Sequence, residues 1–550
     1  NLTDSATDVE RTRNYPADRA IRILHGLVDL LAAAAERLVG APWTIVVDGF
    51  DQAGALVQAF YPHLLRRRGK DLGLTLLIAT APGRGDEAMG RFPAACQGAR
   101  FYLDLTGDVP VVLSPLEARA EALALEAEAG TDPIQREILL PAIIPAWLAS
   151  DEPQRALPWL GEALDRYVTQ GLYADALPYG EMALNLLEAH DAANLDGRWF
   201  ITAKLFNIFA GLNEGPKANA VIEQFLTHTA NPWYTFQCNY YQAMLWSRFL
   251  PERNYDRAEA YLLEGLDSLQ RCEMEEERKQ FRGVFLKNGL ALIRVRQRRM
   301  EEALELCQEG FRLMARILPD VHHLHRSVLL YNSAQVYVMI GRVDEAIEQF
   351  GGAIAMDPNY SEYYNDRGSI FLGLGRLAEA EADYRRAIEL SPPYAEVWVN
   401  LGQCLRQAGR EREAVEAYGR ALDLEPALPS ARLARAECLE GLGDLPTALL
   451  DYDELLAVSP AHVVARGNRA VLHWTMGRPD LALHDLTTAI EIAPREAELY
   501  QNRAVALVEV GRPQEARADL QTYLRLAPEA EDRAAVEAQI AELEGVGAHG

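Results

Sequence analysis

The chain has 550 residues, 49% of them hydrophobic, which suffices for several domains or for one long repeat array with a large core. The formal net charge of −26 repels phosphate backbones, so we expect no nucleic-acid partner. No run approaches the roughly 20 apolar residues of a membrane span, and the six cysteines form no Cys-x-x-Cys pair, so we expect reduced cysteines in a cytoplasmic protein without membrane contact.

Residues 1–115 alternate helix-like stretches with short apolar runs. Trp43–Asp48 and Leu74–Thr80 are rich in β-branched residues and predict two buried strands, and Ala99–Leu105 is a third candidate. Strands that alternate with helices are typical of a parallel α/β sheet. The helices expected between the strands cover Ala17–Val39 and Gln52–Arg68.

Two motifs in this segment resemble a known family. VVDGFDQA (Val46–Ala53) resembles the Walker B motif of NACHT-type STAND ATPases, and ATAPGR (Ala79–Arg84) falls where that family has its sensor strand. The resemblance implies a partial P-loop NTPase-like domain over residues 1–115. In it Asp48 would coordinate Mg²⁺, Asp51 would help to position a hydrolytic water, and Thr80 would complete the nucleotide site. The alternative for Asp48 is a turn residue at a strand end.

The segment also departs from that family. The sequence contains no GxxxxGK[ST] phosphate loop, Gln52 replaces the second family acid, and Ala81 replaces the sensor arginine. We therefore expect no complete catalytic site and no cofactor held by this chain alone. ATP and Mg²⁺ binding would need a phosphate loop upstream of the Walker B segment.

Residues 327–530 contain six in-register repeats of 34 residues. Each repeat has alanine at position 20, a ring or leucine at position 24 and proline at position 32, a pattern that predicts two closely packed helices. Glycine at position 15 would end the first helix in a left-handed turn. These glycines are Gly341, Gly375, Gly409, Gly443, Gly477 and Gly511.

The repeat resembles the tetratricopeptide repeat, whose opening residues are matched by Trp398, Leu401 and Gly402. The resemblance implies a mostly α protein, an α-solenoid superhelix of stacked hairpins. A helical connector over residues 116–153 would join this array to the N-terminal segment. A capping helix over Glu531–Glu544, within residues 531–550, would close the array through Ala535, Ile540 and Leu543.

The period loosens upstream of the regular repeats. Further position-20 alanines are spaced by 42, 40 and 45 residues, and then by 43 residues to Ala346. They predict longer, irregular hairpins of the same kind over residues 154–326, the alternative being an unrelated helical domain. These alanines are Ala176, Ala218, Ala258 and Ala303.

The first helices of such hairpins would line a concave face through repeat positions 2, 5, 6, 9, 12 and 13. Position 6 carries a row of amides and one acid, which could hold the backbone of an extended peptide; the alternative is that they bond a neighbouring repeat. The predicted ligand-binding residues are Asn332, Asp366, Asn400, Asn468 and Asn502 at position 6, and Tyr331, Gln335, Gln403, Arg406 and Trp474 elsewhere on the face.

Three further groups have structural interpretations. We expect the arginines at position 7 to pair with acidic residues of adjacent hairpins, the alternative being carboxylate binding. His322–His325 is expected to be a loop between hairpins, with no metal bound. The aromatic residues of the middle array are expected in the core. These arginines are Arg367, Arg435, Arg469 and Arg503, and the aromatic residues include Trp199, Trp233 and Trp246.

The two resemblances together favour a protein- or peptide-binding solenoid that acts as the sensor arm of a STAND-type signalling ATPase, a family whose members assemble into homo-oligomers on activation. The first alternative is a non-enzymatic scaffold or adaptor. The second is part of an ATPase-and-repeat transcriptional regulator, which would need a DNA-binding domain elsewhere.

Overall fold

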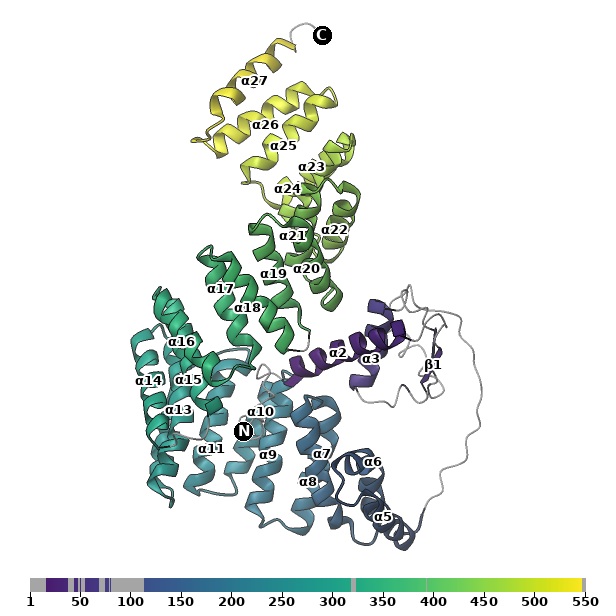
Figure 1. The fold of residues 1–550 in the computed structure, drawn as a ribbon, viewed down its shortest axis with the longest axis vertical. Coiled ribbons are helices and arrows are strands. Elements are labelled where there is room, and N and C mark those ends of the chain that lie inside the picture. The colour runs from purple at the N-terminus through teal and green to yellow at the C-terminus, as the bar shows by residue number, and fades with distance from the viewer. Residues whose placement is uncertain are drawn as a thin grey trace. The chain divides into compact units, whose positions relative to one another are not determined.

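The computed structural model describes residues 16–37, 44–47, 50, 55–68, 75–78, 80, 113–317, 323–391 and 393–546. The chain divides into two compact units, residues 1–367 with 390–393, and residues 368–389 with 394–550. The described residues form 25 α-helices and a single two-stranded sheet, so the fold is a mostly α solenoid (Figure 1). The sheet is much smaller than the α/β domain that the sequence led us to expect.

The small sheet belongs to the N-terminal part of the first unit. Strands β1 (Thr44–Val47) and β2 (Thr75–Ile78) pair in parallel, as predicted, with Val46 opposite Leu77. One sheet face packs on α3 (Ala55–Arg68) through Val47 and Phe50. The third predicted strand, Ala99–Leu105, lies outside the described residues.

Helix α2 (Pro16–Arg37) attaches this part to the helical array of the first unit. Both Nη atoms of Arg22 donate to Oε1 of Glu362 at 3.1 Å, and the two side chains are almost completely buried. Nη1 also donates to the Ser391 hydroxyl at 3.2 Å. The buried ion pair therefore joins two segments that are far apart in the sequence.

Pairs of consecutive helices build the rest of the first unit, and successive pairs lie side by side in chain order (Figure 1). The alanines at the crossing points, including Ala176 and Ala303, are fully buried. The helices are α5 (Pro115–Ala129), α6 (Pro133–Ala149), η3 (Pro153–Ala156), α7 (Leu157–Gln170), α8 (Tyr173–His190), α9 (Leu195–Gly211), α10 (Gly215–Leu226), α11 (Pro232–Met244), the π-helical η4 (Leu245–Phe249), α12 (Tyr255–Arg271), α13 (Glu276–Arg296), α14 (Met300–Ile317), α15 (His323–Met339), α16 (Val343–Met356) and α17 (Ser361–Gly373), whose last residues belong to the second unit.

The second unit continues the regular hairpins. At Gly402 an added Cβ would lie only 2.7 Å from a ring carbon of Tyr418, which explains why position 8 is small where position 24 is a ring. The helices are α18 (Leu377–Leu390), α19 (Ala395–Gln407), α20 (Glu411–Leu424), α21 (Pro429–Gly441), α22 (Leu445–Val458), α23 (Val463–Thr475), α24 (Pro479–Ile492), α25 (Ala497–Glu509), α26 (Pro513–Leu526) and α27 (Arg533–Val546).

Left-handed turns join the helices of each hairpin. All six position-15 glycines have φ between 69° and 79°, as predicted. In the irregular hairpins the same conformation is taken by Gly171, by Asn213 with φ 60° and by Arg298 with φ 64°. The irregular hairpins therefore keep the turn geometry, although two of these three turns have no glycine.

Three local expectations need correction or completion. In α27, Ile540 and Leu543 pack against the last hairpin as expected, but Ala535 is exposed and Val536 is the buried residue. The expectation of a loop was wrong for His325, which lies inside helix α15 with its ring packed edge-on against Phe285. The aromatic residues of the middle array are largely core, as expected.

None of the described helices is long and apolar enough to cross a membrane.

Candidate functional site

One exposed stripe runs along the first helices of the hairpins in the second unit. On α23, exposure recurs at Val464, Val471 and Trp474, with Asn468 half-buried between them, because these positions share one side of the helix. Helix α19 contacts α21 and α23 contacts α25, so the two first helices of each of these pairs lie next to each other. We call this stripe the first-helix face; it comprises Glu396, Asn400, Gln403 and Arg406 on α19, Ser430, Ala434, Glu437 and Glu440 on α21, Val464, Asn468, Val471 and Trp474 on α23, and Glu498, Asn502, Val505 and Val508 on α25.

Six of the predicted ligand-binding residues lie on this face. The three asparagines are half-buried, and the Gln403, Arg406 and Trp474 side chains are exposed. The position-6 row is interrupted once, at Ala434 on α21. The structure thus places these residues on one accessible surface, and their contact with a ligand stays a prediction.

The α19–α21 part of the face is charged. Nη1 of Arg406 donates to Oε2 of Glu437 at 2.6 Å, which neutralises one of two acids that lie one turn apart on α21. The second acid, Glu440, is half-buried, and burial raises the pKa of its carboxyl group, with a smaller contribution from Glu437. The Tyr452 hydroxyl lies beside Glu440 and Asn468, and burial raises its pKa as well.

The α23–α25 part of the face is apolar. Val471, Trp474, Val505 and Val508 are each 39–42% exposed. The face therefore has its exposed large apolar side chains on α23 and α25, with Glu498 beside them, and most of its charged side chains on α19 and α21.

The remaining predicted ligand-binding residues lie in the first unit and have hydrogen-bond partners within it. The Tyr331 hydroxyl and the Gln335 side-chain amide each donate to Oδ2 of Asp366 at 2.7 Å. The Asn332 amide donates to Oδ1 of Asn288 on α13 at 2.7 Å, so it bonds a neighbouring hairpin, which was the alternative. Asn288 was missed because the irregular spacing upstream hides its repeat position.

The position-7 arginines also have structural partners. Nε and Nη2 of Arg435 donate to the two oxygens of Asp451 at 2.8 and 2.6 Å, and Arg503 binds Asp519 in the same way. These acids belong to the arginine's own hairpin, so the prediction of a partner in an adjacent hairpin was wrong for the main contact. The acids Asp451 and Asp519 stand at position 23 of their repeats. In the repeat 395–428, Leu401 replaces the arginine at position 7 and Ala417 replaces the acid at position 23, so both charges are missing together.

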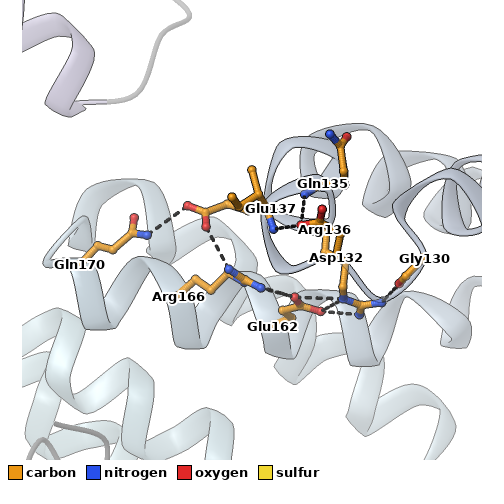
Figure 2. Close-up of polar contacts among 9 residues, drawn as sticks. Gly130, Asp132, Gln135, Arg136, Glu137, Glu162, Arg166 and Gln170 are labelled. Carbon is orange, nitrogen blue, oxygen red and sulfur yellow. Dashed lines mark hydrogen bonds and ion pairs between the residues drawn. The ribbon is translucent and has the colours of Figure 1, made fainter. Parts of the chain in front are cut away.

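A second polar cluster, on α6 and α7, was not predicted (Figure 2). Arg136 bonds Glu162 at 2.5 Å through Nη2, and Arg166 bonds both Glu162 and Glu137 at 2.9 Å. Gln170 completes the set by donating to Glu137 at 3.1 Å. Two arginines and two glutamates balance in charge, so the cluster links the two helices and leaves no net charge to attract a ligand.

The nucleotide-site predictions are only partly covered by the described residues. Asp48 and Asp51 lie outside them. Thr80 is half-buried and follows β2 by two residues. Since β1 and β2 are parallel, their carboxyl ends meet at one edge, which is compatible with the predicted geometry but does not test a role in Mg²⁺ binding.

The described residues offer little reactive chemistry. They include no group of three His, Cys, Asp or Glu side chains that could hold a metal ion. Five cysteines are free and buried, and burial raises the pKa of the Cys238 and Cys307 thiols to about 12. Such thiols stay protonated and are poor nucleophiles.

Four family models, each described as a tetratricopeptide repeat, match residues 285–359, 331–395, 395–428 and 489–541. None of the four reaches residues 1–115. No curated protein matches the chain.

Among solved structures, the chain is similar to YrrB, described as a TPR protein with an unusual peptide-binding site. The identity is 20% over 36% of this chain and 97% of that chain, with a TM-score of 0.31. It is also similar to PilW, a type IV pilus biogenesis factor, at 21% identity over 38% and 97% of the two chains, with a TM-score of 0.34. A third structure, the APC/C hetero-tetramer Cut9-Hcn1, is 15% identical over 77% and 93% of the two chains, with a TM-score of 0.33.

Proposed function

Because the chain is a tetratricopeptide repeat protein, we propose that it is a scaffold or adaptor whose first-helix face binds an extended segment of another protein. The observation that carries this proposal is the row of Asn400, Asn468 and Asn502, which occupy the same repeat position on one accessible stripe. The upstream set around Asp366 lies in the first unit, is bonded there and is not part of this face.

An asparagine amide suits such a role because it offers both donors and acceptors. An extended peptide presents N–H and C=O groups along its whole length, and side-chain amides can pair with them without depending on its sequence. At α21 the row is interrupted by Ala434, and charged groups stand nearby instead. We therefore expect backbone recognition on α19, α23 and α25, and recognition of particular side chains at α21.

The finer assignment, the sensor arm of a STAND-type ATPase, remains a hypothesis that rests on Val46–Ala53 and Ala79–Arg84. Most of these residues lie outside the described part of the chain. ATP titration of the chain in a calorimeter, with and without Mg²⁺, tests whether this chain binds the nucleotide that the hypothesis requires. The regulator of transcription stays a further alternative that depends on a DNA-binding domain.

The proposed function is tested by mapping where a peptide binds. A phage-displayed random-peptide library is selected against the full chain, and hydrogen exchange is then followed with and without a selected peptide. We expect added protection in α19, α23 and α25, and little change in the second helices α20, α24 and α26. Protection confined to the second helices or to the first unit would show that the binding surface lies elsewhere.

A further inference from the structure

Helix α2 contacts two first helices of the array in the first unit. It contacts α7, the first helix of the hairpin that α7 forms with α8. Through Arg22 it also binds Glu362 on α17, at position 2 of the repeat 361–394, one of the repeat positions predicted to line a concave face. A Cβ added at Gly26 would lie 3.9 Å from Cδ of Pro393. All of these residues belong to the first unit, so one helix joins first helices that are far apart in the sequence.

The attachment at α17 is polar and involves few atoms. Both Nη atoms of Arg22 donate to Oε1 of Glu362 at 3.1 Å, and Nη1 donates to the Ser391 hydroxyl at 3.2 Å. The side chains of Arg22 and Glu362 are 4% and 3% exposed. Among the described residues, the apolar clusters that contain side chains of α7 and α17 include no side chain of α2. The array therefore has a core of its own, to which α2 does not belong.

Helix α2 also binds α3, through contacts that do not involve Arg22. Nη2 of Arg67 donates to Oδ1 of Asp29 at 2.8 Å, and Nη1 of Arg67 donates to the carbonyl oxygen of His25 at 3.2 Å. Because these contacts lie within the N-terminal part of the chain, α2 and α3 can stay together when Arg22 leaves Glu362.

The buried carboxylate of Glu362 requires a cation, because removal of one partner of a buried ion pair leaves an uncompensated charge. A guanidinium group is less strongly hydrated than an ammonium group and has donors on separate nitrogen atoms, which suits a buried contact with both Glu362 and Ser391. A helix can carry this group to the site. The buried residues on one side of α2 follow one another at intervals of three or four residues, namely Arg22, His25, Val28 and Ala32.

We propose that the surface around Glu362 and Ser391 is a binding site for an arginine-bearing helix, which α2 occupies in the free chain and which a helix of a partner protein takes over. In this exchange an arginine of the partner replaces Arg22, so the buried ion pair is conserved. The partner helix has the chemistry of α2, with an arginine at the start of a largely apolar side. The site lies in the first unit, apart from the first-helix face, so it goes beyond the proposed function and does not depend on it.

The test uses the full chain and a fluorescently labelled synthetic peptide with the sequence of residues 16–37, whose binding is followed by anisotropy. In the wild type, α2 competes from within the same chain, so we expect weak peptide binding. Arg22→Glu places a second acid beside Glu362 and should release α2, so this variant should bind the peptide at least tenfold more tightly. The matched control is Lys217→Glu, which reverses an exposed charge on α10 and should bind the peptide as the wild type does.

Two exchanges of charge show whether the ion pair itself controls binding. A chain with both Arg22→Glu and Glu362→Arg can form the pair again with its charges reversed, so it should bind the wild-type peptide as weakly as the wild-type chain does. A peptide that carries Arg22→Glu should not bind the Arg22→Glu chain. Hydrogen exchange should show that the wild-type peptide protects α7 and the first turn of α17 in that chain.

Three outcomes would contradict the proposal. They are equal peptide affinities of the wild-type and Arg22→Glu chains, tight binding of the peptide that carries Arg22→Glu, and protection confined to helices other than α7 and α17. Thermal unfolding shows whether each variant is folded. If Arg22→Glu does not fold, Arg22→Gln, which removes the charge without reversing it, replaces it with the same expectations.

Discussion

Arg469 binds both carboxylate oxygens of Asp485, with Nε–Oδ2 and Nη2–Oδ1 distances of 2.8 and 2.6 Å. Asp485 is only 1% exposed, and Arg466 also donates to its Oδ1 at 3.1 Å. Arg469 also reaches Asp453 of the preceding repeat at 2.7 Å. The position-7 arginine therefore compensates a buried acid of its own hairpin and links it to the hairpin before.

The first prediction takes as its model the repeat 395–428, which lacks the arginine–aspartate pair between positions 7 and 23. Arg503→Leu should destabilise the last hairpins by about 2–4 kcal/mol, because it leaves the carboxylate of Asp519 buried without its partner. Replacing both residues, Arg503→Leu with Asp519→Ala, copies Leu401 and Ala417 and should recover part of that loss. Urea unfolding, followed by local hydrogen exchange, measures the stability of both variants. A loss of stability in the double variant that equals or exceeds that of Arg503→Leu would contradict the role of the pair.

The second prediction concerns the left-handed turn before α14. Arg298 is exposed and has a φ of 64°, a conformation that costs a residue with a side chain about 1 kcal/mol or more. Arg298→Gly should therefore stabilise the first unit by about 0.5–1 kcal/mol, even though glycine usually weakens a chain. Gly477→Ala, at a φ of 69°, is the matched control and should have the opposite sign. Thermal melts of both variants measure these changes, and a lower melting temperature for Arg298→Gly would contradict the prediction.

The third prediction concerns close packing. Gly402→Ala places a Cβ 2.7 Å from the Tyr418 ring, so the ring or the helix must shift, at a cost of about 1–3 kcal/mol. Gly351→Ala on α16 is the control, because its added Cβ meets no atom of the described residues within 4 Å. That variant should gain up to about 1 kcal/mol from helix propensity. The two alanine substitutions should therefore move the unfolding midpoint in opposite directions.

The fourth prediction concerns pH. The folded-state pKa of Glu440 is raised above its ordinary value of 4.5, so the folded protein binds this proton more tightly than the unfolded chain. Stability contributed by this group must therefore fall as the pH rises from about 4.5 through the raised pKa. Glu440→Gln removes the dependence, so it should be more stable than wild type at pH 7, with a difference that shrinks toward pH 4.5. A difference that grows on acidification would contradict the assignment.

Much of the helical array follows from local rules in the sequence. The position-15 glycines predicted the turns, and the alanines predicted the close helix crossings, because both depend on backbone geometry within one hairpin. The partners of long polar side chains do not follow in this way. Asn332 meets Asn288 across 44 residues of irregular spacing, and the repeat alignment contained no signal for that contact.

The contact between the Tyr452 hydroxyl and Glu440 was equally hidden. Tyr452 is the ring at position 24 of its repeat, part of the pattern that predicted closely packed helices, and the ring is indeed buried. The position of its hydroxyl beside Glu440 depends on how α21, α22 and α23 pack together. An acid at position 12 next to a tyrosine at position 24 of the same repeat is a sequence signal that could have pointed to it.

The most direct test of the account is the affinity of a selected, fluorescently labelled peptide for the variant Asn400→Ala, Asn468→Ala, Asn502→Ala. The matched control is Gln514→Ala with Gln521→Ala, which removes exposed amides from α26. If the first-helix face holds the peptide backbone, the triple variant should bind about 10- to 100-fold more weakly and the control should bind normally, since each amide hydrogen bond contributes about 0.5–1.5 kcal/mol. A correctly folded triple variant with wild-type affinity would contradict the account.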